Sequence, residues 1–237
     1  YGRDEPNQGV WAVPFDLANR RATGDPFPVA PGAQRFSVSD SGLLEYGLFD
    51  VSEQQDELVW LDSAGVATAI PGSRVRVVAL APAPEGSRVA MSILEKGRFS
   101  LVVRDIGTGL DNPIVPAAEY PITGLTWSAD GRRILFSQIE GFQSAIRSVM
   151  ADGGAQPTTV TIGAAPAISP DGKTLLFEND ERGARRIKSV AFADGAIAGE
   201  PALLRRPEDD VEEAIVSPDG RLVAFTMWKD DAPHVYV

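Results

Sequence analysis

Short apolar runs recur along the chain, and each is bounded by residues that favour turns. The clearest runs are 89–91, 134–136, 175–177 and 223–225, and Leu43, Leu44 and Tyr46 form a weaker one. Runs this short are typical of buried strands rather than helices. No segment has sustained helical periodicity, so the pattern predicts an all-β protein.

The same tight turn precedes every one of these runs. Its sequence is SPDG in two copies, SADG in a third, and APEG and SDSG in two weaker copies. The glycines that end the turns are Gly42, Gly86, Gly131, Gly172 and Gly220. They are spaced 44, 45, 41 and 48 residues apart. A period of roughly 40 residues indicates a repeat architecture in which each copy is one structural unit.

The residues of this turn predict a β-hairpin. Proline at the second position of three copies fixes φ at about −65°, which suits a type I turn, and the glycine can take a positive φ and form a bulge. The acidic residue before the glycine can accept hydrogen bonds from local backbone amides. These acids are Asp130, Asp171 and Asp219 in the clearest copies, and we expect them to stabilise the turns rather than to bind a metal or act in acid–base chemistry.

Two more strands are expected after each hairpin. The third strand fits 58–61, 101–103, 146–150 and 187–192, and a shorter, more polar fourth strand fits 66–70, 112–115, 156–162 and 200–204. Four antiparallel strands repeated around an axis make a β-propeller. A β-sandwich would not need the same turn at the same place in each unit.

The repeats divide the chain into blades of one propeller domain. We expect partial blades at 1–33 and 207–237, and whole blades at 34–71, 72–117, 118–162 and 163–206. Further copies of the third strand fit 10–16 and 234–237 at the two ends of the chain. The chain therefore has six copies of the third strand but only five hairpins. Either the two ends form an unusual closing blade or neighbouring sequence is missing, and we expect the second, because a bare sheet edge invites aggregation. The intact propeller is then six-bladed or larger.

The turn and the strand after it resemble the TolB-like class of bacterial propellers. That class has a Ser-Pro-Asp-Gly turn, a Lys or Arg, and an apolar strand, which matches 169–177 and 217–225 here. The copy at 128–136 departs from the pattern at Ala129, and the copies at Gly42 and Gly86 depart further.

The order of several phrases gives a narrower resemblance. Four segments are similar to the C-terminal half of propellers that are fused to bacterial serine/threonine kinases and sometimes to transcriptional regulators. They are VWAVPFDLANRRATGDPFPVA, FSVSDSGLLEY, ELVWLDSAG and APHVYV. The resemblance implies a fused kinase or other regulatory domain in a longer protein, although no kinase catalytic phrase is present. One propeller scaffold hosts many activities, so the motif indicates fold more strongly than function.

Composition narrows the possible partners and cofactors. The 33 Asp and Glu outnumber the 22 Lys and Arg, giving a formal charge of −11, which repels nucleic acid and anionic lipid. No apolar run approaches the roughly 20 residues of a membrane span. The chain has no cysteine, which excludes disulfides and thiolate metal sites.

Candidate catalytic and metal-binding groups are sparse. His234 is the only histidine, and no G-x-S-x-G phrase occurs, so we expect neither a triad hydrolase nor a histidine zinc site. The segment from Asp105 to Asn112 alternates oxygen ligands with glycines, as a calcium loop does, and Asp105 and Asp111 are its candidate ligands. The segment lacks the final glutamate of an EF-hand, and it also fits an ordinary turn between the third and fourth strands. Calcium is the one cofactor that the sequence suggests.

Acidic residues concentrate in loops that a propeller gathers on one face. These are the loops between the second and third strands and the connections between blades. Their acids are Asp50, Glu53, Asp56, Glu57, Glu119, Glu140, Asp180, Glu181, Glu208, Asp209, Asp210, Glu212, Glu213, Asp230 and Asp231. Such a surface is either a solvated face or a site for a cationic partner.

Aromatic residues among these acids favour a binding site. The predicted ligand-binding residues are Glu119, Tyr120, Phe142, Asp180, Arg182 and Trp228. Aromatic rings beside carboxylates can hold a cationic peptide or a basic patch of a partner protein. The sequence therefore predicts a non-catalytic propeller that binds a protein, peptide or small ligand. The alternatives are a substrate-gating propeller of a prolyl-oligopeptidase-like peptidase and a TolB-type envelope protein.

Overall fold

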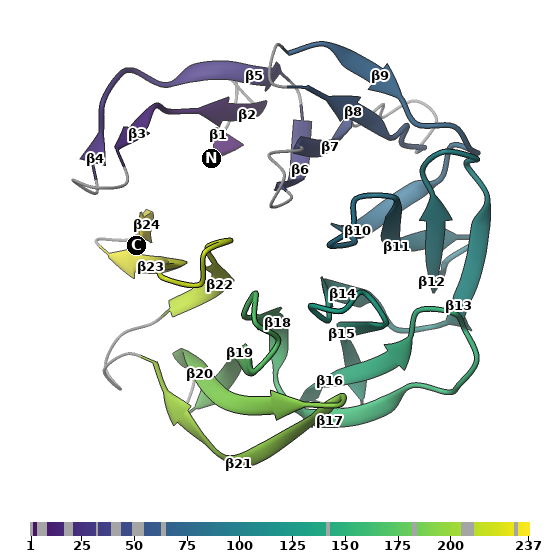
Figure 1. Ribbon diagram of the computed structural model, residues 1–237, viewed down its shortest axis with the longest axis vertical. Coiled ribbons are helices and arrows are strands. Elements are labelled where there is room, and N and C mark those ends of the chain that lie inside the picture. The colour runs from purple at the N-terminus through teal and green to yellow at the C-terminus, as the bar shows by residue number, and fades with distance from the viewer. Residues whose placement is uncertain are drawn as a thin grey trace.

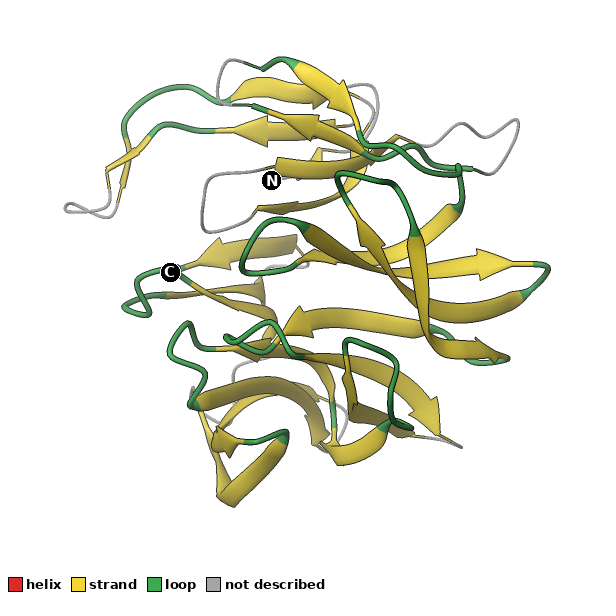
Figure 2. Cartoon of the chain, turned by 45° about the vertical axis from the view of Figure 1, so that its right-hand side comes forward, coloured by secondary structure: helices red, strands yellow, loops and turns green. Residues whose placement is uncertain are grey.

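The described part of the chain consists of strands and the loops that join them. The computed structural model describes residues 2–3, 9–16, 21–31, 33–38, 44–48, 55–62, 65–140, 143–181, 184–204, 211–229 and 232–237. No helix occurs among these residues, as Figure 2 shows.

Six sheets of three or four strands form a ring in the described residues, with their planes set around a common centre (Figure 1). The first sheet contains β1 (Gly2–Arg3), β2 (Gly9–Ala12) and β5 (Phe27–Pro31), and the second contains β6 (Ala33–Val38), β7 (Leu44–Leu48), β8 (Val59–Leu61) and β9 (Ala67–Ala69). The third contains β10 (Arg76–Pro82), β11 (Arg88–Glu95), β12 (Arg98–Asp105) and β13 (Asp111–Ala118), and the fourth contains β14 (Ile122–Trp127), β15 (Arg133–Glu140), β16 (Gln143–Met150) and β17 (Thr158–Ile162). The fifth contains β18 (Ala164–Ile168), β19 (Thr174–Glu181), β20 (Ala184–Ala193) and β21 (Ala196–Leu203), and the sixth contains β22 (Val211–Val216), β23 (Val223–Lys229) and β24 (Ala232–Tyr236). A separate two-stranded ribbon joins β3 (Phe15–Asp16) to β4 (Arg21–Ala22).

The arrangement confirms the predicted all-β propeller. Within each sheet the strands pair antiparallel in chain order, so every pair of neighbours is joined by a local connection. The first strand of a sheet lies nearest the centre, and the fourth lies at the rim (Figure 1). The inner strands β6, β10, β14, β18 and β22 contact one another in succession, which closes the sheets side by side.

The apolar runs of the second strands are the most deeply buried segments. Met91, Phe136 and Leu175 have no exposed surface. They lie in clusters that span successive sheets, such as the one that unites Leu101 of β12 with Phe136 of β15. Burying each large apolar side chain contributes about 1.5 to 3 kcal/mol, so the sheet-to-sheet contacts hold the ring together.

The antiparallel order gives the ring two different faces. Turns between first and second strands and connections between third and fourth strands lie at one end of every sheet, which we call the turn face. Hairpins between second and third strands and connections between successive sheets lie at the other end, which we call the loop face. The repeated Asp-Gly turns therefore all belong to the turn face.

A polar contact between neighbouring sheets recurs beside the inner strands. The Ser137 hydroxyl of β15 accepts a hydrogen bond from the Ala165 amide of β18 at 2.9 Å. At the next junction, Glu178 accepts one from the Glu213 amide at 2.6 Å. Ala165 and Glu213 have φ values of 46° and 57° and lie at bulges of their inner strands. A bulge frees an amide from the sheet ladder, and here the preceding sheet supplies its acceptor.

Candidate functional site

The Asp-Gly turns share one hydrogen-bond pattern. In the first of three, the Ser128 hydroxyl donates to Asp130 Oδ1 at 2.6 Å and accepts from the Arg133 amide at 2.9 Å. Asp130 Oδ1 also accepts from the Arg132 amide at 3.1 Å, and the Gly131 amide donates to the Ser128 carbonyl. The turns at Ser169 and Ser217 repeat these contacts. The serine, which the sequence argument did not use, thus supports both the acid and the start of the second strand.

The hydrogen bonds of the turn favour the ionised acid. The serine hydroxyl lowers the pKa of Asp130, Asp171 and Asp219, and the backbone amide two residues after each aspartate lowers it further. Because these carboxylates are used within their own turns, their contacts agree with the structural role predicted for them.

The APEG turn differs from the others because Ala83 stands where they have serine. Glu85 therefore has no serine hydroxyl at that position and binds Arg88 Nε at 2.6 Å. Arg88 also donates to the Gly131 carbonyl of the next sheet at 2.9 Å, and its guanidinium lies 4.9 Å from the centre of the Trp127 ring. Burial pushes the pKa of Glu85 upward, but the hydrogen bonds and the charge of Arg88 outweigh it and leave the pKa below its usual value.

A cleft of about 440 Å³ opens at the following junction on the turn face. It lies between the turns of the β14–β17 and β18–β21 sheets, and the connection between β20 and β21 forms one wall. Its lining residues are Ser128, Ala129, Asp130, Arg132, Arg133, Met150, Asp171, Gly172, Lys173, Phe192, Ala193, Asp194 and Gly195. The floor is partly apolar and the rim carries charges of both signs.

The loop face carries those predicted binding residues that the structure describes. Glu119 and Tyr120 lie in the connection between β13 and β14; both are exposed, and Tyr120 keeps 49% of its surface. Asp180 is exposed near the end of β19. Trp228 lies in β23, but its side chain is outside the described part.

Several other predicted residues lie outside the described part of the chain. They are Gly42, Asp50, Glu53, Phe142, Arg182, Glu208, Asp209, Asp210, Asp230 and Asp231, together with the side chains of Glu140 and Glu181.

An acidic group spans two sheets at the loop face. Glu178 and Asp180 come from β19, while Glu212 and Glu213 come from β22. Arg185 forms an ion pair with Glu212, so one of these acids already has a cation beside it. Burial raises the pKa of Glu178, because an ionised carboxylate is poorly solvated there, even though the Glu213 amide and Arg185 favour its charged form.

Asp56 does not belong to the acidic surface on which the sequence placed it. It is only 6% exposed, and its Oδ2 accepts a hydrogen bond from the Val77 amide of β10 at 2.6 Å. Its backbone also bridges to Val75, so the segment before β8 packs against the next sheet. The carboxylate therefore joins two sheets instead of facing solvent.

Comparison with known proteins identifies the fold. No protein-family profile matches the chain, and no curated protein matches it. TolB from Acinetobacter baumannii superposes with a TM-score of 0.70 at 15% identity, over 90% of this chain and 54% of TolB. The chain has a TolB-like β-propeller fold.

Propellers of hydrolytic enzymes also superpose on this TolB-like propeller. A puromycin hydrolase gives a TM-score of 0.62 at 15% identity, over 82% of this chain and 35% of the enzyme. A prolyl endopeptidase gives 0.59 at 14% identity, over 90% and 36%. The chain thus spans about half the length of TolB and about a third of each enzyme.

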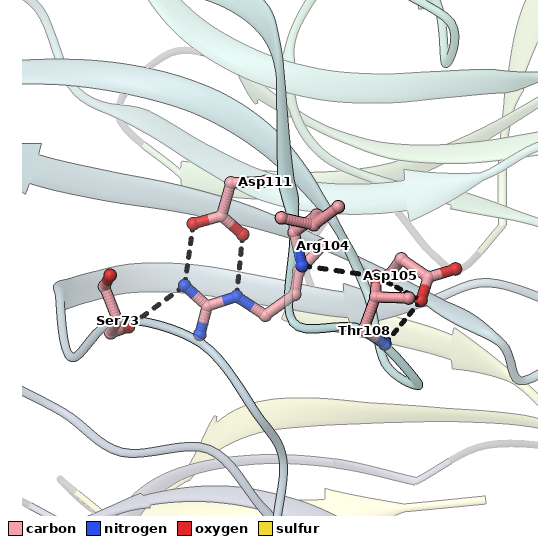
Figure 3. A network of polar contacts seen from close by, with 6 residues as sticks. Ser73, Arg104, Asp105, Thr108 and Asp111 are labelled. Carbon is pink, nitrogen blue, oxygen red and sulfur yellow. Dashed lines mark hydrogen bonds and ion pairs between the residues drawn. The ribbon is translucent and has the colours of Figure 1, made fainter.

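In the candidate calcium loop of the TolB-like propeller, Asp111 forms an ion pair with the buried Arg104 (Figure 3). Arg104 is 2% exposed, and its Nε and Nη2 donate to the two oxygens of Asp111, each at 2.7 Å. Asp105 Oδ1 accepts from the hydroxyl and amide of Thr108 at 2.7 and 2.8 Å. These bonds lower the pKa of Asp105, with the Thr108 hydroxyl as the main cause.

The contacts of this loop favour the turn interpretation over calcium. Both oxygens of Asp111 already bind a guanidinium, so a cation would have to displace Arg104 and leave its charge buried. Calcium binding stays a prediction that a calcium titration of thermal stability tests, and an unchanged midpoint at millimolar ion would end it.

Two further features bear on catalysis and membranes. His234 is exposed on β24. Within the described residues there is no group of three or more His, Cys, Asp or Glu placed to hold a metal ion. The same residues include no helix long and apolar enough to cross a membrane.

Proposed function

We propose that this TolB-like propeller is a non-catalytic recognition domain of a larger bacterial regulatory protein. Its ligand is a protein, a peptide or a small molecule that carries positive charge, and it binds at the acidic loop face. The observation that carries this proposal is the group of acids that β19 and β22 bring together across a sheet junction.

The charges at this junction are unbalanced. Arg185 pairs with Glu212, whereas Asp180 and Glu213 have no cation within ion-pair distance among the described residues. Exposed Glu119 and Tyr120 lie on the same face, in the connection between β13 and β14. A cationic ligand would supply the missing counter-charges, and an aromatic ring beside a carboxylate adds a cation–π contact.

Binding of a lysine- and arginine-rich decapeptide to the whole chain tests the proposal. We expect Glu119→Ala and Trp228→Ala each to weaken binding by about tenfold, because charged and aromatic contacts at an interface are commonly worth about 1 to 2 kcal/mol. Isothermal titration calorimetry measures the affinity, and circular dichroism checks that each variant folds.

Glu200→Ala is the matched control, since Glu200 is an exposed acid on β21, away from the loop face. Its affinity should equal that of the unchanged protein. Unaltered binding in both test variants would place the site elsewhere, and equal losses in Glu119→Ala and Glu200→Ala would indicate only general charge attraction.

The superposition on hydrolase propellers favours one alternative, a propeller that gates substrate entry to a peptidase domain. One of those structures is described in terms of inter-domain dynamics in catalysis and specificity. The complete gene separates the alternatives, because a peptidase domain must contain a G-x-S-x-G phrase and a TolB-type envelope protein needs an export signal.

A further inference from the structure

Two arginines occupy the same position in neighbouring repeats but have different surroundings. Arg88 and Arg133 each follow the turn glycine by two residues and begin the second strand of their sheet. Arg88 is hydrogen-bonded to the next sheet across its junction, whereas the junction beside Arg133 contains the cleft of the turn face. The comparison shows what Arg133 lacks.

Arg88 has three different contacts. A carboxylate of Glu85 binds it at 2.6 Å, the Gly131 carbonyl accepts at 2.9 Å, and the Trp127 ring lies beneath it. Two of its five N–H donors thus bind one ionised and one neutral acceptor, and one face of the guanidinium is covered by an aromatic ring.

Two of the three groups that would serve Arg133 in the same way are replaced or already engaged, and the third, the carbonyl of Gly172, makes no hydrogen bond to Arg133. Asp130 stands at the position of Glu85, but it is one carbon shorter, and its Oδ1 is bound by the Ser128 hydroxyl and the Arg132 amide. Ile168 stands at the position of Trp127, so no ring is offered. Among the described residues, the one hydrogen bond from the Arg133 guanidinium is a long one of 3.5 Å to the Ser148 hydroxyl.

Two further cations line the same cleft. Arg132 and Lys173 are exposed at its rim, and neither has a carboxylate within ion-pair distance in the part of the chain described. Arg133 is half-buried, and its guanidinium lies against Gly195, where a Cβ would come within 3.0 Å of Cζ. The cleft is thus a partly apolar hollow that Met150 and Phe192 help to line. Its three cations have unused donors, although Asp130, Asp171 and Asp194 line it as well.

We propose that this cleft binds a carboxylate group, which gives Arg133 the ionised acceptor that Glu85 gives Arg88. Lys173 and Arg132 add charge from the rim, and the apolar part of the lining receives the carbon skeleton of the ligand. The carboxylate comes either from a peptide, as its C-terminus or an acidic side chain, or from a small free acid. The site is on the face opposite to the acidic loop face and does not depend on the function proposed above.

Titration of the whole chain with two probes tests this site. The probes are an N-acetylated pentapeptide that ends in Leu-Glu, and succinate. We expect at least one of them to bind with a dissociation constant of about a millimolar or tighter, because two or three charge-assisted hydrogen bonds suffice for that affinity. Nuclear magnetic resonance chemical shifts of the arginine Nε–H groups report the contact directly.

Variants assign the binding to Arg133. Arg133→Gln should weaken binding by at least about tenfold, and Arg133→Lys should give an intermediate loss because charge remains while the planar fork is lost. Arg221→Gln is the matched control, because Arg221 is the turn cation of the next sheet and does not line the cleft. It should change the affinity by less than about twofold.

The outcomes separate the sources of the carboxylate. Binding of the peptide alone indicates a polypeptide ligand, and binding of succinate as well indicates that the carboxylate is sufficient. Failure of both probes, or equal affinity for the unchanged protein and a folded Arg133→Gln variant, would overturn the proposal. If Arg133→Gln does not fold, Lys173→Gln on the exposed rim takes its place, with an expected loss of about threefold, and no loss there would likewise overturn it.

Discussion

Single hydroxyl groups organise the turns of this propeller. Ser128, Ser169 and Ser217 each donate to a carboxylate and accept from a backbone amide, so one atom joins the acid of the turn to the start of the next strand. Where Ala83 replaces the serine, the acid turns to an arginine instead. The acid of the turn thus binds a serine hydroxyl where serine is present and an arginine of the same hairpin where it is absent.

Removal of one such hydroxyl should be measurable. Ser169→Ala deletes the bonds at 2.6 Å to Asp171 and at 2.9 Å from the Thr174 amide, and we expect it to lower the free energy of unfolding by about 1 to 2 kcal/mol. Ser73→Ala, at an exposed serine in the connection between β9 and β10, is the control and should change nothing, because only the backbone carbonyl of Ser73 is used in a contact. Urea denaturation measures both.

The effect of Ser169→Ala should also depend on pH. The pKa of Asp171 is lowered in the folded state, so its carboxylate contributes stability above the ordinary pKa of an aspartate, and that contribution is lost as the pH falls through the lowered value. The stability gap between the two proteins should narrow across this acid range. A gap that stays constant would show that the bond to the charged form contributes nothing.

Glu178 should respond to pH in the opposite sense. Burial raises its pKa in the folded state, so the protonated form stabilises the fold at low pH, and this contribution is lost as the pH rises through the raised value. Glu178→Gln mimics the protonated acid and keeps an acceptor for the Glu213 amide. It should raise the melting temperature by about 1 to 3 °C at pH 7 and have no effect well below the ordinary pKa. Glu200→Gln, at an exposed acid on β21, should be neutral at both pH values.

The sheets depend on close contacts between their connections as well as on their strands. Gly109, in the connection between β12 and β13, lies against the segment that joins β9 to β10, where a Cβ would be 2.4 Å from the Pro71 carbonyl carbon. Arg104 of β12 reaches the same segment and donates to the Ser73 carbonyl at 3.0 Å (Figure 3). One blade is therefore fixed to the preceding connection by a close approach of Gly109 and a hydrogen bond from Arg104.

Substitution of Gly109 separates the cost of the contact from the cost of the backbone conformation. Gly109 and Gly97 both have positive φ, 71° and 76°, but a Cβ at Gly97 would meet nothing within 4 Å. Gly97→Ala should cost about 1 kcal/mol, the strain of a left-handed alanine, while Gly109→Ala should cost at least about 3 kcal/mol because backbone must move. If the two substitutions lower the free energy of unfolding equally in denaturant, the segment around Pro71 moves aside at no cost.

The whole ring carries an excess of acid, with a formal charge of −11, yet places cations in one cleft of its turn face. Its loop face combines acids from two sheets. A domain with separate sites on its two faces can bind different chemical groups at the same time, because the strands keep the two ends of each sheet apart.

Association at the loop face should depend strongly on salt. Raising the salt concentration from about 0.1 to about 1 M shortens the Debye length from about 10 to about 3 Å. We expect the association rate of the cationic decapeptide to fall by about tenfold or more, since long-range attraction drives its encounter. Stopped-flow fluorescence measures the rate, and a neutral peptide of equal length is the control. A rate that is independent of salt would contradict an electrostatic site.

The repeat made the fold predictable from the sequence, whereas the sites depend on contacts between repeats. Turn signals and apolar runs are local, so they marked the hairpins at Gly86, Gly131, Gly172 and Gly220 and the strands that follow them. The same reasoning misplaced Asp56 on the surface, because its partner, the Val77 amide, lies in another sheet. Alignment of the repeats would have paired Arg88 with Arg133, but not shown that one is satisfied and the other is not.

By itself the sequence determined the all-β class, the period and the chemistry of the turns, because a turn depends on residues that are neighbours in the chain. The tertiary structure alone decided that Arg88 binds the Gly131 carbonyl, that Glu178 is buried beside Glu213, and that a cleft remains beside Arg133. Each of these depends on how two sheets approach each other. That approach follows from the packing of side chains between them, which no local pattern specifies.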